Sequence, residues 1–105
     1  MPRCARLKSF DSVYHIMIRS ISDTPLFRCN ADKDKYLSLI KKYQGIYLFK
    51  VYAYCIMDNH GHMIIDGAGA DISRIMHCIN QSYAQYFNIK YNRHGHLFQS
   101  RHEVA

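Results

Sequence analysis

Two histidines separated by a single glycine, His60-Gly61-His62, carry the clearest chemistry in this sequence. An apolar stretch precedes them and Met63-Ile64-Ile65 follows, which is typical of the start of a β-strand. In a strand, residues two apart point to the same face, so both imidazoles are presented to one point. Such a pair supplies half of a binding site for a divalent cation.

The two residues before the pair, Asp58 and Asn59, suggest which ion this would be. They can act as oxygen ligands or as hydrogen-bond partners of the imidazoles. Oxygen ligands suit a hard ion, so we expect Mg²⁺ or Mn²⁺. The cysteines form no C-x-x-C pair, which disfavours a zinc finger, and a closed tetrahedral zinc site is disfavoured because no cysteine lies next to the histidine pair in sequence. The sequence does not indicate a third metal ligand.

A chance origin of the triplet stays open, because the chain has seven histidines and repeats the pattern at His94-Gly95-His96. The second triplet lies in a polar segment beside Arg93, where a loop is expected. We interpret His94 and His96 as surface loop residues or phosphate contacts.

The elements that would position the histidines follow from hydrophobic spacing. Val13 to Ile21 is rich in β-branched and aromatic residues and predicts a strand. A helix is expected from Asn30, its N-cap, to Gly45, where it would stop. The stretch from Ile46 to Met57 is almost continuously apolar and predicts a strand buried on both faces. After a turn at Asp58-Asn59, the strand from His60 to Asp66 must pair antiparallel with it.

A second helix and a final strand complete the predicted fold. Asp71 is a candidate N-cap, and apolar residues at helical spacing continue to about Tyr91. The tail from Leu97 to Ala105 could supply an edge strand. The order β-α-β-β-α-β predicts an α+β, ferredoxin-like split βαβ domain with both helices on one face of an antiparallel sheet. The 105 residues suit a single domain.

The composition of the chain indicates the kind of partner and the cellular compartment to expect. Lys and Arg outnumber acids 14 to 8, giving a net charge of +6, so an anionic partner is expected and nucleic acid fits better than a membrane. No membrane-spanning run or signal peptide is seen, which predicts a cytoplasmic protein. Widely spaced cysteines disfavour a disulfide framework, and Cys55 and Cys78 are expected to be small buried residues.

Several segments in the right order resemble one family. Ile56 to Ile65, which reads IMDNHGHMII, resembles the "M-P-N-H-x-H-hydrophobic" motif of the HUH single-tyrosine transposases, in particular the REP-associated tyrosine transposases. Tyr14-His15-Ile16-Met17 with Arg19 resembles the family's first strand, and Pro25-Leu26-Phe27 its entry to the first helix. Phe87-Asn88 and Tyr91 to Arg101 resemble the segment after its second helix.

The resemblance implies a ferredoxin-like domain in which His60 and His62 bind a divalent metal and a tyrosine attacks DNA to form a 5′-phosphotyrosine link. In the family that tyrosine follows the final strand, so we expect it beyond Ala105 and expect residues 1–105 to be a C-terminally incomplete domain. Tyr83, Tyr86 and Tyr91 have the helical spacing of core residues and are not expected to be the nucleophile.

The expected partner is single-stranded or hairpin DNA, and the family also implies a homodimer. The candidate DNA-binding residues are four cations and three aromatic residues that could stack on bases, namely Arg19, Lys90, Arg93, Arg101, Tyr14, Tyr91 and Phe98. The lysines between Lys33 and Lys42 are expected on the solvated face of the first helix.

Three functions from different classes remain open on the sequence. The first is a transposase domain that nicks and rejoins DNA with a downstream tyrosine. The second is a binding-only, catalytically inactive remnant that grips hairpin DNA without cutting it. The third is a ferredoxin-like interaction module whose histidines are incidental.

Overall fold

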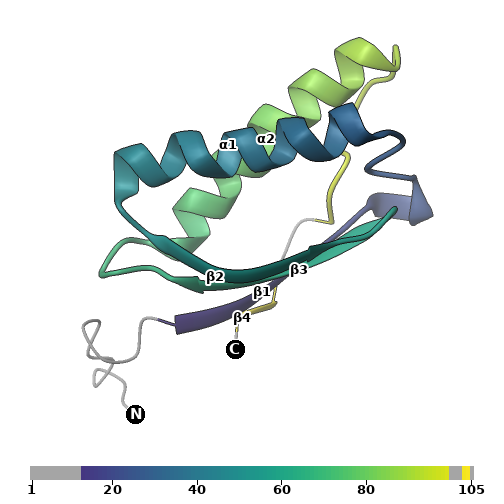
Figure 1. Ribbon diagram of the computed structural model, residues 1–105. Coiled ribbons are helices and arrows are strands. Elements are labelled where there is room, and N and C mark those ends of the chain that lie inside the picture. Colours follow the sequence, from purple (N-terminus) through teal and green to yellow (C-terminus); the bar gives the residue numbers. More distant parts are fainter. Residues whose placement is uncertain (1–12, 100–102, 105) are drawn as a thin grey trace.

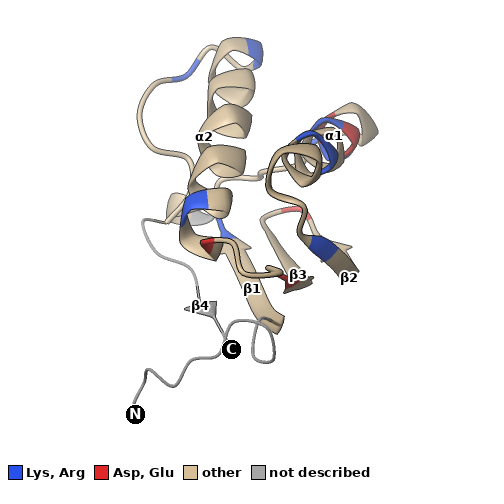
Figure 2. Ribbon diagram, turned by 90° about the vertical axis from the view of Figure 1, so that its left-hand side faces the viewer, with Lys and Arg blue, Asp and Glu red and all other residues tan. Residues whose placement is uncertain are grey.

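The computed structural model describes residues 13–99 and 103–104. In chain order the elements are β1 (Val13–Arg19), the 3₁₀ turn η2 (Ile21–Asp23), α1 (Asn30–Tyr47), β2 (Lys50–Ile56), β3 (His60–Asp66), α2 (Ile72–Lys90) and β4 (Glu103–Val104). The strands form a sheet of order β2-β3-β1-β4 in which all neighbours are antiparallel. Both helices lie on one face of it (Figures 1 and 2). The predicted α+β, ferredoxin-like fold is confirmed.

The two central strands, β1 and β3, have one face packed against the helices and one open face. Ile16 and Ile18 on β1 and Met63 and Ile65 on β3 are buried beneath the helices. Because side chains alternate along a strand, the residues between them point to the opposite face. The core is completed by apolar residues of the helices and loops, including Leu26, Phe27, Tyr36, Leu39, Ile40, Ile75, Met76, Ile79, Tyr83, Phe87 and Leu97.

Helix α2 begins as the sequence predicted. The carboxylate of Asp71 accepts hydrogen bonds from the backbone N–H groups of Ser73 at 3.1 Å and Arg74 at 3.3 Å. These bonds satisfy donors that the first helical turn leaves without a partner. No helix in the described part of the chain is long and apolar enough to cross a membrane.

Helix α1 differs from the prediction at both ends. Asn30 is its first helical residue and not its cap; the N-cap is Cys29, whose side chain makes no capping hydrogen bond. Asp32 instead reaches back and accepts from the backbone N–H of Arg28 at 3.0 Å. The helix also continues past Gly45 to Tyr47, because the left-handed residue that ends it is Leu48 (φ 61°, ψ 31°). The Leu48 N–H bonds to the carbonyl of Gln44, which closes the last turn.

The prediction of a long strand buried on both faces was wrong. Strand β2 covers only Lys50–Ile56, since Ile46 and Tyr47 belong to α1. It is an edge strand, and Tyr52 and Tyr54 are 58% and 56% exposed. An apolar run therefore predicted a buried position that the edge of the sheet does not provide.

The cysteine predictions had mixed outcomes. Cys55, expected to be buried, is exposed because it lies on the edge strand β2. Cys78 on α2 is half-buried. Cys4 lies outside the described residues.

The first strand is shorter than predicted, since β1 ends at Arg19. The next residue, Ser20, forms an isolated antiparallel bridge with Phe98. Farther along the tail, Val104 pairs with Ile16 of β1, so the predicted final edge strand is present as the two-residue β4. The tail thus returns along the β1 side of the sheet.

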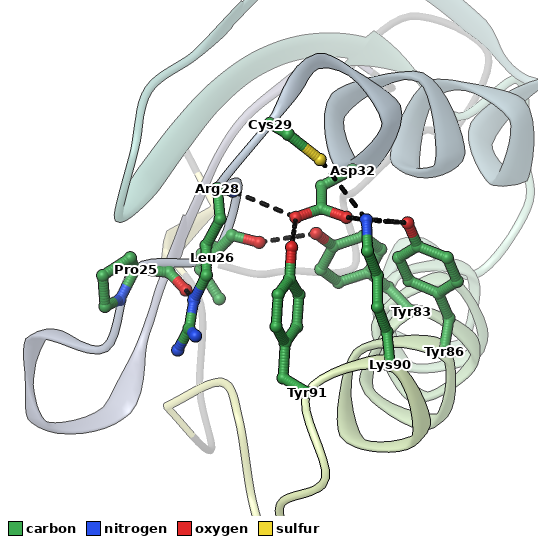
Figure 3. A network of polar contacts seen from close by, with 9 residues as sticks. All are labelled: Pro25, Leu26, Arg28, Cys29, Asp32, Tyr83, Tyr86, Lys90 and Tyr91. Atoms are coloured by element: carbon green, nitrogen blue, oxygen red, sulfur yellow. Dashed lines mark hydrogen bonds and ion pairs between the residues drawn. The ribbon is translucent and has the colours of Figure 1, made fainter.

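One buried carboxylate joins the start of α1 to the end of α2 (Figure 3). The Asp32 side chain is fully buried. Its oxygens accept from Lys90 Nζ at 2.7 Å, from the Tyr86 hydroxyl at 2.7 Å and from the Tyr91 hydroxyl. With the Arg28 backbone N–H, four donors surround it. Hydrogen bonding on this scale offsets the large cost of burying a charge.

The electrostatics of this helix clamp, defined as Asp32 with Tyr86, Lys90 and Tyr91, favour the charged forms of both ions. Burial by itself would raise the pKa of Asp32, but the hydrogen bonds from Lys90 and the two tyrosines outweigh it and hold that pKa well below its usual range. The hydrogen bond to Asp32 in turn raises the pKa of Lys90.

We expect Asp32→Asn to lower the free energy of unfolding by about 2–4 kcal/mol, because it leaves donors of the clamp around a neutral amide. The folded-state pKa is depressed, so the carboxylate stabilises the protein fully above its unfolded-state pKa of about 4 and loses this contribution as the pH falls below it. Urea unfolding at several pH values should therefore show the two proteins converging in acid. Asp34→Asn, at an exposed position of the same helix, is the control. A constant difference between pH 7 and pH 3 would contradict this account.

Candidate functional site

His60 and His62 lie on the open face of the sheet, as their spacing predicted. Their neighbours in β3, Gly61 and Met63, are buried on the helix side, while both histidines are half-buried. The two ring centroids are 5.3 Å apart and the rings are nearly perpendicular, at 88°. Two imidazoles are therefore held side by side in the middle of the sheet.

Each imidazole is anchored through its Nδ1 atom. His60 Nδ1 lies 2.9 Å from Asn59 Oδ1. An amide oxygen only accepts, so His60 donates from Nδ1, and in the neutral imidazole this tautomer keeps a lone pair on Nε2. His62 Nδ1 lies 3.2 Å from Nε2 of a third histidine, His15 of β1. The rings of His15 and His62 are 5.3 Å apart and nearly parallel, at 21°.

Backbone contacts fix the turn that leads into β3. The carbonyl of Asp58 accepts from the N–H groups of Leu26 at 2.7 Å and Phe27 at 3.0 Å. The carbonyl of Asn59 accepts from Ser20 N–H at 3.1 Å. Of the two residues predicted to assist the histidines, Asn59 does so with its side chain, whereas Asp58 contributes its carbonyl and leaves its side chain exposed.

Gly61 allows β3 to approach both neighbouring strands closely. A Cβ atom there would lie 3.3 Å from the Cys55 carbonyl oxygen on β2 and 3.4 Å from Ile18 Cγ1 on β1. Even an alanine there would require these neighbours to move by a few tenths of an ångström. The glycine of the triplet thus serves packing on the helix side.

His60 and His62 can supply two nitrogen ligands of an open metal site. Nitrogen atoms of two neutral imidazoles suit a divalent transition ion and leave other positions to oxygen ligands. Within residues 13–99, no group of three or more His, Cys, Asp or Glu side chains is arranged to hold an ion.

Apart from Phe98, six residues were predicted to bind DNA, and two of them lie on β1, on opposite faces. Arg19 is exposed and is the direct cross-strand partner of His60, so its side chain shares the open face. Tyr14 pairs with Ile65 and packs against the core on the helix side. Arg101 lies outside the described residues.

The other three are engaged near the end of α2. Lys90 and Tyr91 belong to the helix clamp, and Arg28 stacks on the Tyr91 ring with its guanidinium 4.4 Å from the centroid. Arg93 donates to Asn88 Oδ1 at 2.9 Å and to the His96 carbonyl at 3.2 Å. These bonds shape the loop after α2.

The loop after α2 and the residue Phe98 also carry sequence predictions. His94 and His96 are exposed in the loop after α2, as expected. Phe98, a candidate for base stacking, is half-buried and packs on Tyr36 and Tyr83. Figure 2 shows lysine and arginine positions on both helices, on β2 and in the loop after α2.

The tyrosines on α2 and at its C-cap are not prepared for nucleophilic attack. Tyr83 is buried and donates to the Leu26 carbonyl, and burial raises its pKa. Burial and the bond to Asp32 raise the pKa of Tyr86, and the bond to Asp32 raises that of Tyr91 to about 12. The sheet also separates their helix from the histidines (Figure 1). Their assignment to packing agrees with these positions.

Two residues were not predicted from the sequence: His15, a neighbour of the histidine pair, and Asp32, the centre of the helix clamp. A signal for the first was present, since His15, Met17 and Arg19 alternate with the buried Ile16 and Ile18. For Asp32 no such signal exists, because it stands among the charged residues of an amphipathic helix.

Comparison with solved structures shows a shared fold. A REP-associated tyrosine transposase solved in complex with a REP hairpin superposes with a TM-score of 0.72 at 13% sequence identity. The match covers 90% of this chain and 55% of that one, so this chain spans about half the length of the solved transposase. A search of functionally curated proteins finds no match.

Comparison with protein families identifies a relationship in sequence. The profile described as "Transposase IS200 like" matches residues 8–105, which is nearly the whole chain. This protein therefore belongs to the IS200-like transposase family.

Proposed function

We propose that this domain grips single-stranded or hairpin DNA and holds a divalent metal, Mg²⁺ or Mn²⁺, through His60 and His62. The observation that carries the proposal is the geometry of that pair. Both imidazoles face outward from the central strand, and each has its Nδ1 atom engaged, which leaves Nε2 for a ligand. When bound, the ion would polarise a phosphate of the DNA backbone.

A DNA partner is supported by the family and by charge. The solved relative is bound to a hairpin, and this chain carries a net charge of +6. Arg19, directly across from His60, is placed to hold a phosphate beside the pair. The open face of β1 and β3 is therefore the proposed contact surface.

A nicking reaction would need a tyrosine that reaches the open face. In this proposal the nucleophile lies in a segment beyond Ala105, and it would attack the backbone to form a 5′-phosphotyrosine link and a free 3′-hydroxyl. The alternative, binding without cutting, is favoured for residues 1–105 alone, because Tyr83, Tyr86 and Tyr91 are held in packing or in the helix clamp.

The metal site predicts a loss of binding without a loss of fold. The double substitution His60→Ala and His62→Ala should abolish Mn²⁺ binding in calorimetry, since both proposed nitrogen ligands are removed. Thermal unfolding should change little, because both side chains are half-buried on the open face. His94→Ala with His96→Ala is the matched control, since it removes the same triplet from an exposed loop. Equal Mn²⁺ affinity in the double variant and the wild type would exclude this pair.

For DNA, we expect hairpin affinity to fall steeply with salt, because phosphate contacts release counterions. Arg19→Ala should weaken binding and reduce the slope of log affinity against log salt by about 1, the effect of one lost phosphate contact. Arg74→Ala, exposed at the start of α2 on the helix side, should leave the slope unchanged. Equal effects of the two substitutions would move the binding surface away from the open face.

The same labelled hairpin also tests the role assigned to the tyrosines. Residues 1–105 incubated with the hairpin and Mn²⁺ should yield no covalent adduct on a denaturing gel. An adduct that disappears in Tyr83→Phe, Tyr86→Phe or Tyr91→Phe would overturn the assignment and identify the nucleophile.

We also propose that the domain forms a homodimer through the β2 edge. That edge exposes Tyr52 and Tyr54, and an exposed edge strand offers backbone groups for pairing. Tyr54→Lys should shift light-scattering mass from dimer to monomer, because a lysine at the edge opposes strand pairing. Ile89→Lys, at an 83% exposed position of α2, should not. A monomer mass for the wild type at all concentrations would rule the dimer out.

A further inference from the structure

We propose that His15 is a positioning residue for His62. It would accept a hydrogen bond from the His62 Nδ1–H group and so keep the His62 Nε2 lone pair directed outward. This inference rests on the proposed metal site, and it assigns a role to a histidine outside the His60-Gly61-His62 triplet.

The register of the central strands brings the two rings together. Met17 of β1 is the direct partner of His62, and His15 is the partner of Ile64, so His15 and His62 are diagonal neighbours on the open face. Diagonal pairs are within reach of long or aromatic side chains. The result is the 3.2 Å contact between His15 Nε2 and His62 Nδ1.

The surroundings of His62 leave few other partners for its Nδ1 atom. Its two direct cross-strand neighbours are Met17 and Cys55. A thioether and a thiol are weak hydrogen-bonding groups, so neither would fix the ring. Among the described residues, His15 is the strong partner within hydrogen-bond distance.

His60 shows what a bond donated by His62 would achieve. Asn59 anchors His60 in the tautomer that carries its proton on Nδ1, with Nε2 unprotonated. If His15 accepts, His62 adopts the same tautomer, and the pair offers two equivalent Nε2 atoms. Metal-binding histidines commonly donate their other ring N–H to such a partner, which sets the ring orientation and raises ligand basicity.

Positioning fits His15 better than direct ligation. Its Nε2 atom is the one that contacts His62, so that atom is not available to share an ion with the pair. Consistent with this, the three histidines do not form a three-ligand group in the described structure.

The tautomer of His62 can be measured without metal. Two-bond ¹H–¹⁵N correlation spectra of the metal-free protein, at alkaline pH where imidazoles are neutral, distinguish Nδ1–H from Nε2–H. We expect Nδ1–H at His62 in the wild type and in His15→Gln, whose amide oxygen still accepts. His15→Leu, which removes the acceptor, should shift His62 toward the other tautomer. His15 is exposed, so unfolding temperatures should stay close to that of the wild type.

Mn²⁺ titration of the same three proteins gives the second readout. His15→Leu should weaken binding by about 10- to 100-fold, the usual effect of losing a partner behind a metal ligand, whereas His15→Gln should retain most of the affinity. An Nε2–H tautomer at His62 in the wild type, or an equal loss of affinity in both variants, would overturn the proposal. If the wild type binds no Mn²⁺, the metal site fails, and the spectra still decide whether His15 orients His62.

Discussion

The antiparallel pairing of β1 with β3 is the constraint on which the rest of the structure depends. Its register sets Ile16 opposite Met63 and Met17 opposite His62, so one face is apolar and the other carries the histidines. A shift of one residue would turn the imidazoles into the core and the apolar residues to solvent. Burial of the packed face by the two helices therefore fixes the register of β1 and β3, and with it the position of the histidines on the open face.

The helix layer has its own polar constraint at the end where α1 begins and α2 ends (Figure 3). Asp32 binds Lys90 and the hydroxyls of Tyr86 and Tyr91, and two of these three residues, Lys90 and Tyr91, were also predicted to contact DNA. Removing one partner of such a cluster leaves the others without a hydrogen bond. The helix clamp therefore favours one arrangement of the two helices as well as stabilising it. The segment before α1 is tied to the turn into β3, because the Asp58 carbonyl accepts from the N–H groups of Leu26 and Phe27.

Local patterns in the sequence were sufficient for the fold and for the position of the histidine pair. The bounds of β3 and the cap of α2 at Asp71 were predicted correctly because alternation and capping are local properties. The burial of β2 was predicted wrongly, because an apolar run does not reveal whether its strand lies at an edge. Likewise Asn30 and Gly45 are residue types common at helix ends, but neither ends α1. At its start Asp32 accepts from the Arg28 N–H, and at its end the left-handed Leu48 stops it.

Contacts between distant residues account for what the sequence left undetermined at the site. His15 and His62 are 47 positions apart and meet only through the register of β1 and β3. Lys90 and Asp32 are 58 positions apart, and their pairing depends on how the helices cross the sheet. A charged residue on a helix is ordinarily solvated, so its type gives no reason to expect a buried ion pair.

The proposed metal site places a divalent ion between His60 and His62 on the open face. The most direct measurement is an NMR titration of the assigned, metal-free protein with substoichiometric Mn²⁺, whose paramagnetism broadens nearby resonances. We expect broadening that is strongest at His60 and His62, extends to their cross-strand neighbours Arg19 and Cys55 and is weaker in α1. Broadening centred on His94 and His96, or uniform weak broadening across the chain, would contradict it.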